Sequence, residues 1–306
     1  MEAAFIDQLR RFATHPAARG LNDDAAVLRL GSTQLVLTHD MLVEGVHFLP
    51  SDPPETVAWK LLAVNLSDLA AKGAKPLGAL LGFTLGDADW DRRFAQGLSR
   101  ACAHFACPLL GGDTVSVPIA SSRVFALTAL GEASGPVPSR AGAVSGDTLY
   151  VTGTIGDAGV GLTMAQGDGV PIASLLSAYQ QPVPQGVAGL VLAPIVTAMM
   201  DVSDGLLIDA QRLAEASGCA ISLNLDAVPL SPALAARNGT ARDARLDAAT
   251  AGDDYQLLFT ANLPLPALTC RVSEIGIVSA GRGLTLFDND GAVRLPARLG
   301  WLHGAM

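Results

Sequence analysis

Aspartates gather in this sequence where a strand is expected to end or a helix to turn, and such carboxylates suit hard metal ions. Four stretches share this feature: NDDAAVL (Asp23, Asp24), LTHDML (Asp40), NLSDLAAKG (Asp68) and MMDVSDGL (Asp201, Asp204). Two more join them: GGDT (Gly112, Asp113) and AGDDYQLLF (Asp253, Asp254). Mg²⁺ usually binds one or two carboxylates together with substrate phosphates. The pattern therefore predicts several Mg²⁺ ions that bridge the protein to a polyphosphate.

Asp68 is the least expected of these residues, because it lies inside a stretch that reads as a helix. Asp is unfavourable in a helix interior, since its side chain competes for backbone hydrogen bonds. Lys72 follows one turn later, and an Asp68–Lys72 pair would contribute only about 0.3–0.5 kcal/mol. We favour metal ligation for Asp68 and keep this ion pair as the alternative.

Asp23 and Asp24 stand side by side ahead of a run that reads as a buried strand. Taken alone, the pair indicates a solvated turn. Because the pattern recurs along the chain, we expect Asp24 to face the metal cluster and Asp23 to cap the turn.

The charge balance limits the partners of the protein. The chain of 306 residues has a net charge of −9, with 23 Asp against 6 Glu and 17 Arg against 3 Lys. Nucleic acid is disfavoured as a partner, since phosphate contacts need clustered positive charge. A nucleotide would also be repelled unless metal cations stood between it and the protein. The aspartate stretches would bind such cations.

The usual nucleotide signatures are missing: there is no P-loop, no G-x-G-x-x-G fingerprint and no kinase H-R-D or D-F-G motif. A serine hydrolase elbow and an H-E-x-x-H zinc site are absent too. Glycine-rich turns would let backbone N–H groups approach phosphate. Ser203 could cap a helix whose N-terminus favours anions, and Arg140 could make a single cationic contact to phosphate.

Cysteine usage and hydropathy indicate a cytoplasmic protein. The four cysteines show no C-x-x-C spacing, which argues against zinc and against a disulfide framework. Residues 1–16 read as a short amphipathic helix without the basic start and apolar core of a signal peptide. No apolar run approaches the roughly 20 residues of a membrane span, so no membrane association is expected.

Strands and helices are expected to interleave in both halves of the chain, which favours two α/β domains at residues 1–135 and 145–306. The linker, 136–144, lies in a stretch rich in Gly, Pro and Ser. In the first half we expect strands at 33–42, 76–85, 108–115 and 123–132 and helices at 53–74 and 87–108. In the second half we expect strands at 148–153, 220–225, 254–260 and 284–288, a helix from 156, and two helical patterns around an aspartate-rich turn within 193–218.

The chain resembles the thiamine-monophosphate kinase family of the aminoimidazole ribonucleotide synthetase-like superfamily, in order and over nearly its full length. The resemblance rests on NDDAAVL, THDMLVEGVHFLP, AVNLSDLAAKGAKPLGALLGFTL, LLGGDT, PSRAGAVSGDTLYVTGTIGDAGVGL, DVSDGLLIDAQRLAEASG and AGDDYQLLFT. It implies a layered two-domain fold with an N-terminal domain that forms the core of a homodimer. It also implies binding of ATP with several Mg²⁺ ions and transfer of the γ-phosphoryl group to thiamine monophosphate.

The resemblance also assigns residues. The implied metal ligands are Asp24, Thr38, His39, Asp40, Asp68, Asp113, Asp201 and Asp204. The implied nucleotide contacts are Gly112, Asp113, Arg140 and Ser203, and the implied substrate contacts are His47, Asp253 and Trp301. For His47 the alternative is a capped or solvated loop histidine, and for Trp301 it is core packing.

Three positions depart from the family pattern. His39 stands where Thr or Ser is usual, and an imidazole is a poor Mg²⁺ ligand, so either its backbone carbonyl serves or one metal site is altered. Asn22 replaces a glycine, which is a mild change because Asn tolerates left-handed backbone. GDDY replaces GEDY, which leaves Asp253 one methylene short and could loosen substrate orientation.

The acceptor in such a reaction is a phosphate monoester that is already anionic near neutral pH, so we expect in-line transfer without a general base. Two alternatives stay open. One is a sister ATP-dependent synthetase, although the first cysteine, Cys102, is too late for a selenophosphate synthetase and the HGAM ending lacks the cysteine of the hydrogenase maturation protein. The other is a non-catalytic regulator that binds nucleotide or thiamine phosphate, which the departures at His39 and Asp253 keep open.

Overall fold

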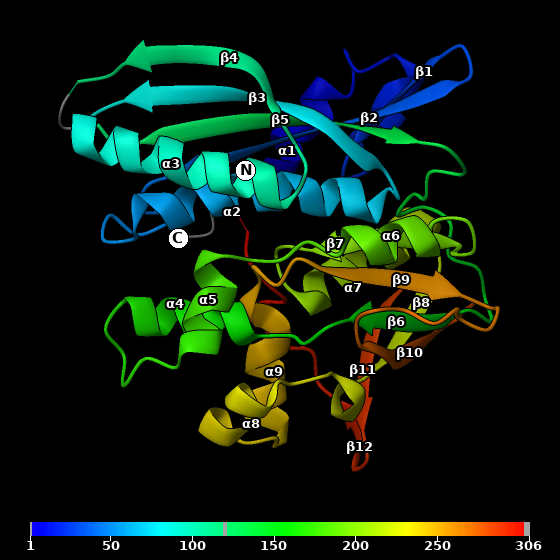
Figure 1. Cartoon of the computed structure of the whole chain (residues 1–306). Helices are drawn as coiled ribbons and strands as arrows, with labels where there is room; N and C mark the ends of the chain where they lie inside the picture. Colours follow the sequence, from blue (N-terminus) through cyan, green and yellow to red (C-terminus); the bar gives the residue numbers. More distant parts are fainter. Residues whose placement is uncertain (1, 119–120, 303–306) are drawn as a thin grey trace.

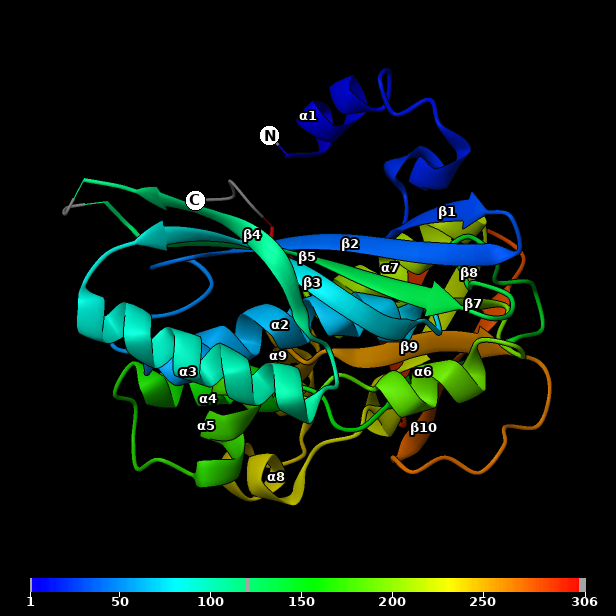
Figure 2. The same cartoon turned by 45° about the horizontal axis from the view of Figure 1, so that its top comes forward.

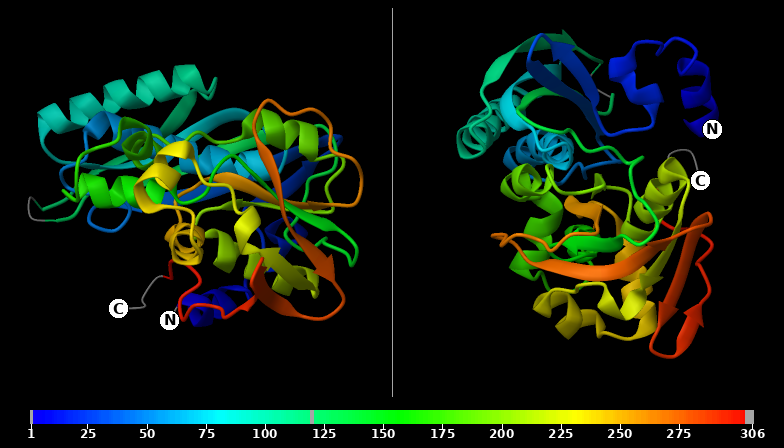
Figure 3. Two further views of the ribbon diagram at one scale, coloured as in Figure 1. Left: turned by 90° about the horizontal axis from the view of Figure 1, so that it is seen from below. Right: turned by 90° about the vertical axis from the view of Figure 1, so that its right-hand side faces the viewer.

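The computed structural model describes residues 2–118 and 121–302, which form two mixed sheets with helices packed on them (Figure 1). The first half of the chain, blue through cyan to green, lies above the second half, green to red, in Figure 1 and in the right-hand view of Figure 3. Within the described residues no helix combines the length and apolarity that a membrane crossing requires. A short helix, α1 (Glu2–Leu9), projects from the rest of the chain and leads through η1 (Pro16–Leu21) into the first sheet (Figure 2).

The first sheet has the strand order β1-β2-β5-β3-β4, and only its β3–β4 pair is parallel. Its strands are β1 (Ala26–Leu30), β2 (Thr33–Val43), β3 (Lys75–Leu85), β4 (Leu109–Ser116) and β5 (Val124–Ala133). Helices α2 (Pro54–Ala71) and α3 (Ala88–His104) cover one face (Figure 1). Aromatic rings fill the space beneath α3, where Phe83 and Phe125 stack with centroids 4.8 Å apart.

The second sheet has the order β12-β11-β8-β10-β6-β9-β7, and only its β11–β8 pair is parallel. Its strands are β6 (Thr148–Thr152), β7 (Ala198–Val202), β8 (Ala220–Asn224), β9 (Gln256–Ala261), β10 (Val272–Ser279), β11 (Gly283–Asp288) and β12 (Gly291–Val293). The helices around it are α4 (Asp157–Ala165), α5 (Ala173–Gln180), α6 (Gly186–Leu192), α7 (Leu206–Ser217), α8 (Pro232–Asn238) and α9 (Arg242–Ala251), with a short η2 (Leu225–Ala227).

Helix α2 is buried on nearly every side, because its other face packs on β7 and α6 of the second half. Proline at its first position starts the helix, and Gly73, in left-handed backbone with φ +58°, follows its end. The contact with α6 requires glycine: a Cβ on Gly189 would lie 2.0 Å from the carbonyl oxygen of Ala70. A helix that is apolar all round is typical of such a central position.

Most expected elements are confirmed, including β2, α2, β3, α3 and the short N-terminal helix. The first helical pattern expected within 193–218 is wrong, because residues 198–202 form β7, in which every residue is buried. A short, continuously apolar run reads alike as buried strand or buried helix. The run after Asp24 was expected to be a buried strand, but β1 is an edge strand whose last two residues are exposed.

Candidate active site

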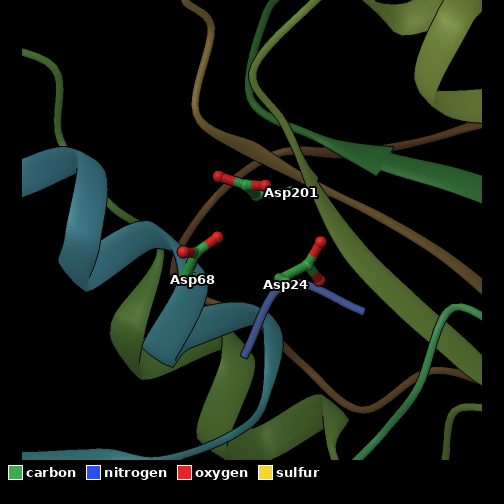
Figure 4. A group of neighbouring side chains, drawn as sticks. All are labelled: Asp24, Asp68 and Asp201. Carbon is green, nitrogen blue, oxygen red and sulfur yellow. The ribbon is translucent and has the colours of Figure 1, made fainter. Parts of the chain in front are cut away.

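Three carboxylates, one buried and two from partly buried residues, meet between the two halves of the chain. They are Asp24 in the turn before β1, Asp68 on α2 and Asp201 on β7, and Figure 4 shows them pointing toward a common space. One oxygen from each carboxylate lies within 4.8 Å of the others. The side chain of Asp24 is fully buried, and Asp201 is 2% exposed. The residues that sequence spacing singled out are thus brought together by two different sheets and the helix between them.

The electrostatics of this cluster favour a cation. Burial raises the pKa of Asp68 and of Asp201 well above the usual range, and repulsion from neighbouring carboxylates raises both further. Burial, with repulsion from Asp24 and Asp204, raises the pKa of Asp40 to about 6. Hydroxyl groups support two members: Thr38 donates to Asp68, and Ser67 donates to Asp201 at 2.6 Å. A cation bound between these carboxylates would offset their mutual repulsion and favour their ionised form, and carboxylate oxygens are ligands that Mg²⁺ accepts.

Asp24 differs from its neighbours because two cations reach it. The Nζ of Lys72 lies 2.7 Å from its Oδ2, and the Nε of Arg140 donates to its Oδ1 at 2.6 Å. Burial opposes ionisation of Asp24, but Lys72 and Arg140 outweigh it and hold its pKa below the usual value. Arg140, expected to contact a nucleotide, is therefore placed at the edge of the carboxylate cluster.

The Asp68–Lys72 ion pair, kept as the alternative to metal ligation, does not form. The ammonium of Lys72, fully buried, pairs with Asp23 and Asp24 and donates to the carbonyl of Met199 at 3.1 Å. Asp23 accepts the N–H of Asp24 at 3.0 Å, as a turn cap does, but it also pairs with Arg19 at 2.6 Å. Its main role is thus charge pairing, and Asp68 is left without a cationic partner among the described contacts.

A cavity of about 270 Å³ opens beside the cluster and is lined by both halves of the chain. It joins the carboxylate end to the residues expected to contact substrate. The expected site residues in its lining are Asp40, His47, Asp68, Asp201, Ser203, Asp204, Asp253 and Trp301. The cavity therefore brings the residues expected to bind metal and those expected to contact substrate into one space.

His47 and Trp301 line this cavity from opposite ends of the sequence. The Nδ1 of His47 accepts the backbone N–H of Val43 at 3.1 Å, which leaves the ring proton on Nε2. Trp301 is 46% exposed, and its backbone N–H donates to the carbonyl of Asp204 at 2.8 Å. Neither residue is a core packing residue, so for Trp301 the core alternative is wrong.

The expected capping role of Ser203 is wrong. Helix α7 begins after Gly205 without a side-chain cap from Ser203. Instead the buried carboxylate of Asp209 accepts the backbone N–H groups of residues 203, 204 and 205 at 3.1–3.2 Å. Burial raises the pKa of Asp209 to about 6, and Arg212, which also pairs with Asp204 at 2.5 Å, acts against that rise. These N–H groups are thus already bound to a carboxylate.

His39 and Asp113 do not join the cluster within one chain. The Nδ1 of His39 lies 2.8 Å from Thr128 Oγ1 on the exposed face of β2, opposite to Asp40. Strand pairing aligns Asp113 with Gly82, Gly82 with Ala126 and Ala126 with Met41, so Asp113 projects from that same exposed face. Three strand spacings, roughly 14 Å, separate Asp113 from β2.

Gly112 has a structural reason to be glycine. Its φ is +157°, and a Cβ there would lie 2.0 Å from the carbonyl oxygen of Leu81 on the neighbouring strand. The glycine is therefore required for the close pairing of β3 and β4, whatever else the strand contacts.

Sequence reasoning missed four residues around the cavity: Lys60, Asp209, Arg212 and Tyr255. The signal that could have found Lys60 is compositional. The chain has only three lysines, and two of them, Lys60 and Lys72, are 2% and 0% exposed. Where arginine is the common base, a lysine inside an apolar helix indicates a specific buried partner.

Comparisons with known proteins identify the family and the fold. Residues 22–133 match the family described as AIR synthase related protein, N-terminal domain, and residues 144–289 match its C-terminal domain. A thiamine-monophosphate kinase of Caulobacter vibrioides is 40% identical over 94% of this chain and 86% of its own length. One of Salmonella typhimurium is 35% identical over 90% of this chain and 86% of its own. The solved structure of AaThiL complexed with AMPPCP and TMP is 31% identical, covers 98% of this chain and 97% of its own, and gives a TM-score of 0.87.

Proposed function

The chain belongs to the AIR synthase related proteins and, within them, to the thiamine-monophosphate kinases, and on this premise we propose how its site performs the reaction. The reaction is ATP-dependent phosphorylation of thiamine monophosphate to thiamine diphosphate. One observation carries the proposal: a single cavity joins the buried carboxylate cluster to His47, Asp253 and Trp301. Phosphates and their cations would occupy one end, and the organic part of the substrate the other.

The carboxylates that line the cavity would hold Mg²⁺. Asp40, Asp68, Asp201 and Asp204 supply the oxygens, and Asp24 completes the cluster with its own charge balanced by Lys72 and Arg140. When bound, the metal ions neutralise charge on the transferring phosphoryl group. The raised pKa values of Asp40, Asp68 and Asp201 support this assignment, since a cation relieves the repulsion that causes part of them.

The residues of the chain itself would position rather than transfer protons. The acceptor oxygen of thiamine monophosphate is anionic near neutral pH and needs no base. His47 is held by its Nδ1 contact to Val43, which fixes the ring orientation toward the substrate end. The main contribution left to the protein is to align the γ-phosphate of ATP with the phosphate of thiamine monophosphate. Such alignment lowers the activation free energy by several kcal/mol.

We further propose that the protein is a homodimer through the exposed face of the first sheet. Met41, Leu80 and Val115 project from this face and are 43–49% exposed. Exposed apolar patches of this kind mark association surfaces. A second copy there would bury these side chains and bring Gly112, Asp113 and His39 into the interface, so the nucleotide and metal roles expected for them rest on the dimer.

The first experiment incubates the protein with ATP, Mg²⁺ and thiamine monophosphate and follows the products by chromatography. We expect stoichiometric thiamine diphosphate and ADP, lost when EDTA removes the metal and absent when thiamine replaces the monophosphate. ATP binding without product would contradict the proposal in favour of the non-catalytic regulator. Product from a different acceptor would favour a sister synthetase.

Sedimentation velocity of the wild type and of the Leu80→Asp variant tests the dimer. The charged side chain of the variant should dissociate it.

A further inference from the structure

Lys60 lies beneath the substrate end of the cavity and contacts two of the three residues expected to bind thiamine monophosphate, His47 and Asp253. It projects from the second turn of α2, and its side chain is 3% exposed. Its Nζ lies 2.6 Å from the Oδ2 of Asp253 and donates to the carbonyl oxygen of His47 at 3.1 Å. One ammonium therefore links a loop of the first half to a turn of the second half.

The turn that carries Asp253 is held in an unusual conformation. Asp253 and Tyr255 both have left-handed backbone, with φ +62° and +51°. Such values cost free energy in residues other than glycine and persist where surrounding contacts impose them. Here the Tyr255 hydroxyl donates to the Oδ1 of Asp253 at 2.9 Å while Lys60 holds the Oδ2. Both oxygens of this carboxylate are thus fixed, although its side chain is still 35% exposed.

The third side of Lys60 is closed by Tyr179 of α5. The Nζ lies 4.3 Å from the centre of the Tyr179 ring, a cation–π distance. The hydroxyl of Tyr179 donates to Asp52 at 2.7 Å, and Asp52 also accepts the N–H of Leu49 at 2.8 Å. The segment from His47 to Asp52 is therefore linked to the ammonium directly at His47 and through Tyr179 at Asp52.

A buried ammonium is costly unless it is paired, so this placement demands an explanation beyond packing. We propose that Lys60 is a positioning residue for thiamine monophosphate: it sets the distance between His47 and Asp253 and aims the Asp253 carboxylate into the cavity. The Asp253 carboxylate then suits the organic part of the substrate, which carries a cationic thiazolium ring and an amine-bearing pyrimidine ring, while the phosphate lies toward the metal end. This inference rests on the proposed function.

The inference also explains the shortened acid of the GDDY turn. An aspartate in this place extends less far than the glutamate usual in the family. Its carboxylate oxygens accept hydrogen bonds from the Lys60 ammonium at 2.6 Å and the Tyr255 hydroxyl at 2.9 Å. These two contacts hold the Asp253 carboxylate in one orientation, which compensates for its shorter side chain. The expected loosening of substrate orientation is in this way offset.

The test is the variant Lys60→Met, which keeps the length of the side chain and removes its charge. Lys75→Met is the matched control, because Lys75 is exposed at the start of β3. We expect Lys60→Met to raise the KM for thiamine monophosphate roughly tenfold or more, as the loss of a charge-assisted hydrogen bond does, with the KM for ATP within about twofold of the wild type. Lys60→Arg should recover part of the lost affinity, because it restores the charge.

Two results would overturn the inference. One is a thiamine monophosphate KM in Lys60→Met equal to that of the control, and the other is an equal rise of both KM values. If Lys60→Met does not fold, a double-mutant cycle of Lys60→Arg with Asp253→Asn decides: additive effects on substrate affinity would contradict the proposal, and strong coupling would support it. Wild-type turnover in the same assay separates failure of this inference from failure of the proposed function.

Discussion

The Oγ of Ser67 donates a 2.6 Å hydrogen bond to the Oδ2 of Asp201, and this bond joins α2 of the first half to β7 of the second. Ser67 precedes Asp68 in the same helix. One turn of helix thus presents a carboxylate to the cluster and also fixes a second carboxylate that arrives from the other sheet.

Replacing Ser67 by Ala should weaken both the fold and the metal site. Removing the Ser67 hydroxyl leaves the buried Oδ2 of Asp201 without its hydrogen-bond donor. This loss should lower the free energy of unfolding by about 1–3 kcal/mol. The Mg²⁺ concentration needed for half-maximal activity should rise as Asp201 loses its fixed orientation. Urea denaturation and Mg²⁺ titration measure the two effects. Ser222→Ala, at a partly exposed strand position, is the control and should change neither.

The variant Asp68→Asn should separate stability from activity. The isosteric change removes a carboxylate whose pKa burial and neighbouring acids raise, so the metal-free protein should be at least as stable as the wild type. Activity should fall by a factor of at least about a hundred, because a metal ligand is lost. Thermal unfolding with and without Mg²⁺ completes the test, since Mg²⁺ should stabilise the wild type more than the variant. Near-normal turnover would refute metal ligation by Asp68.

Lys72→Met should destabilise the protein strongly. The change leaves Asp23 and Asp24 buried without their shared ammonium, and breaking a buried pair costs about 3–5 kcal/mol. The same substitution at the exposed Lys75 should cost less than about 0.5 kcal/mol. The free energies of unfolding of the two variants, measured side by side, give the comparison. Equal values would mean that Arg19 and Arg140 suffice to balance the two aspartates.

Asp254 offers a dependence of stability on pH. Burial raises its pKa well above the usual value, with repulsion from Asp157 and Asp253 adding to the rise, while the N–H of Gly156 donates to its Oδ1 at 2.8 Å and lowers it in part. A raised folded-state pKa means that ionisation destabilises the fold as pH increases from the unfolded pKa through the folded one. Asp254→Asn keeps the acceptor for Gly156 and cannot ionise. It should therefore gain stability over the wild type as pH rises above the ordinary aspartate pKa of about 4, and a difference independent of pH would show that Asp254 does not titrate in the range measured.

The sequence predicted the carboxylate cluster because Asp68 is so poor a choice for a helix interior that only a specific partner accounts for it. Periodicity located α2 and the long strands of the first sheet for similar reasons. It failed at β7, where five buried residues leave no alternation to detect. The error concerned local structure only, since Asp201 reached the cluster that its aspartate pattern had indicated.

The contacts of the lysines could not be predicted in the same way. Lys60 meets Asp253 across 193 positions, and Lys72 meets Asp23 across 49. No local pattern records pairs at such separations: the first arises when the two halves of the chain pack together, and the second when the end of α2 packs against the turn before β1. Ser203 failed for a different, local reason: a more deeply buried acid, Asp209, accepts the N–H groups that a cap would bind.

The position of α2 has a consequence for how the protein unfolds. Its Lys60, Ser67 and Lys72 each bond to a residue of the second half, and Gly189 leaves no room between it and α6. If the second half unfolded alone, the face of α2 that packs on it, with its lysines and apolar side chains, would be exposed to water. If the first half unfolded alone, the buried strand β7 would be exposed. We therefore expect the two sheets to share one unfolding transition, so that a chain with two cores unfolds as a single cooperative unit.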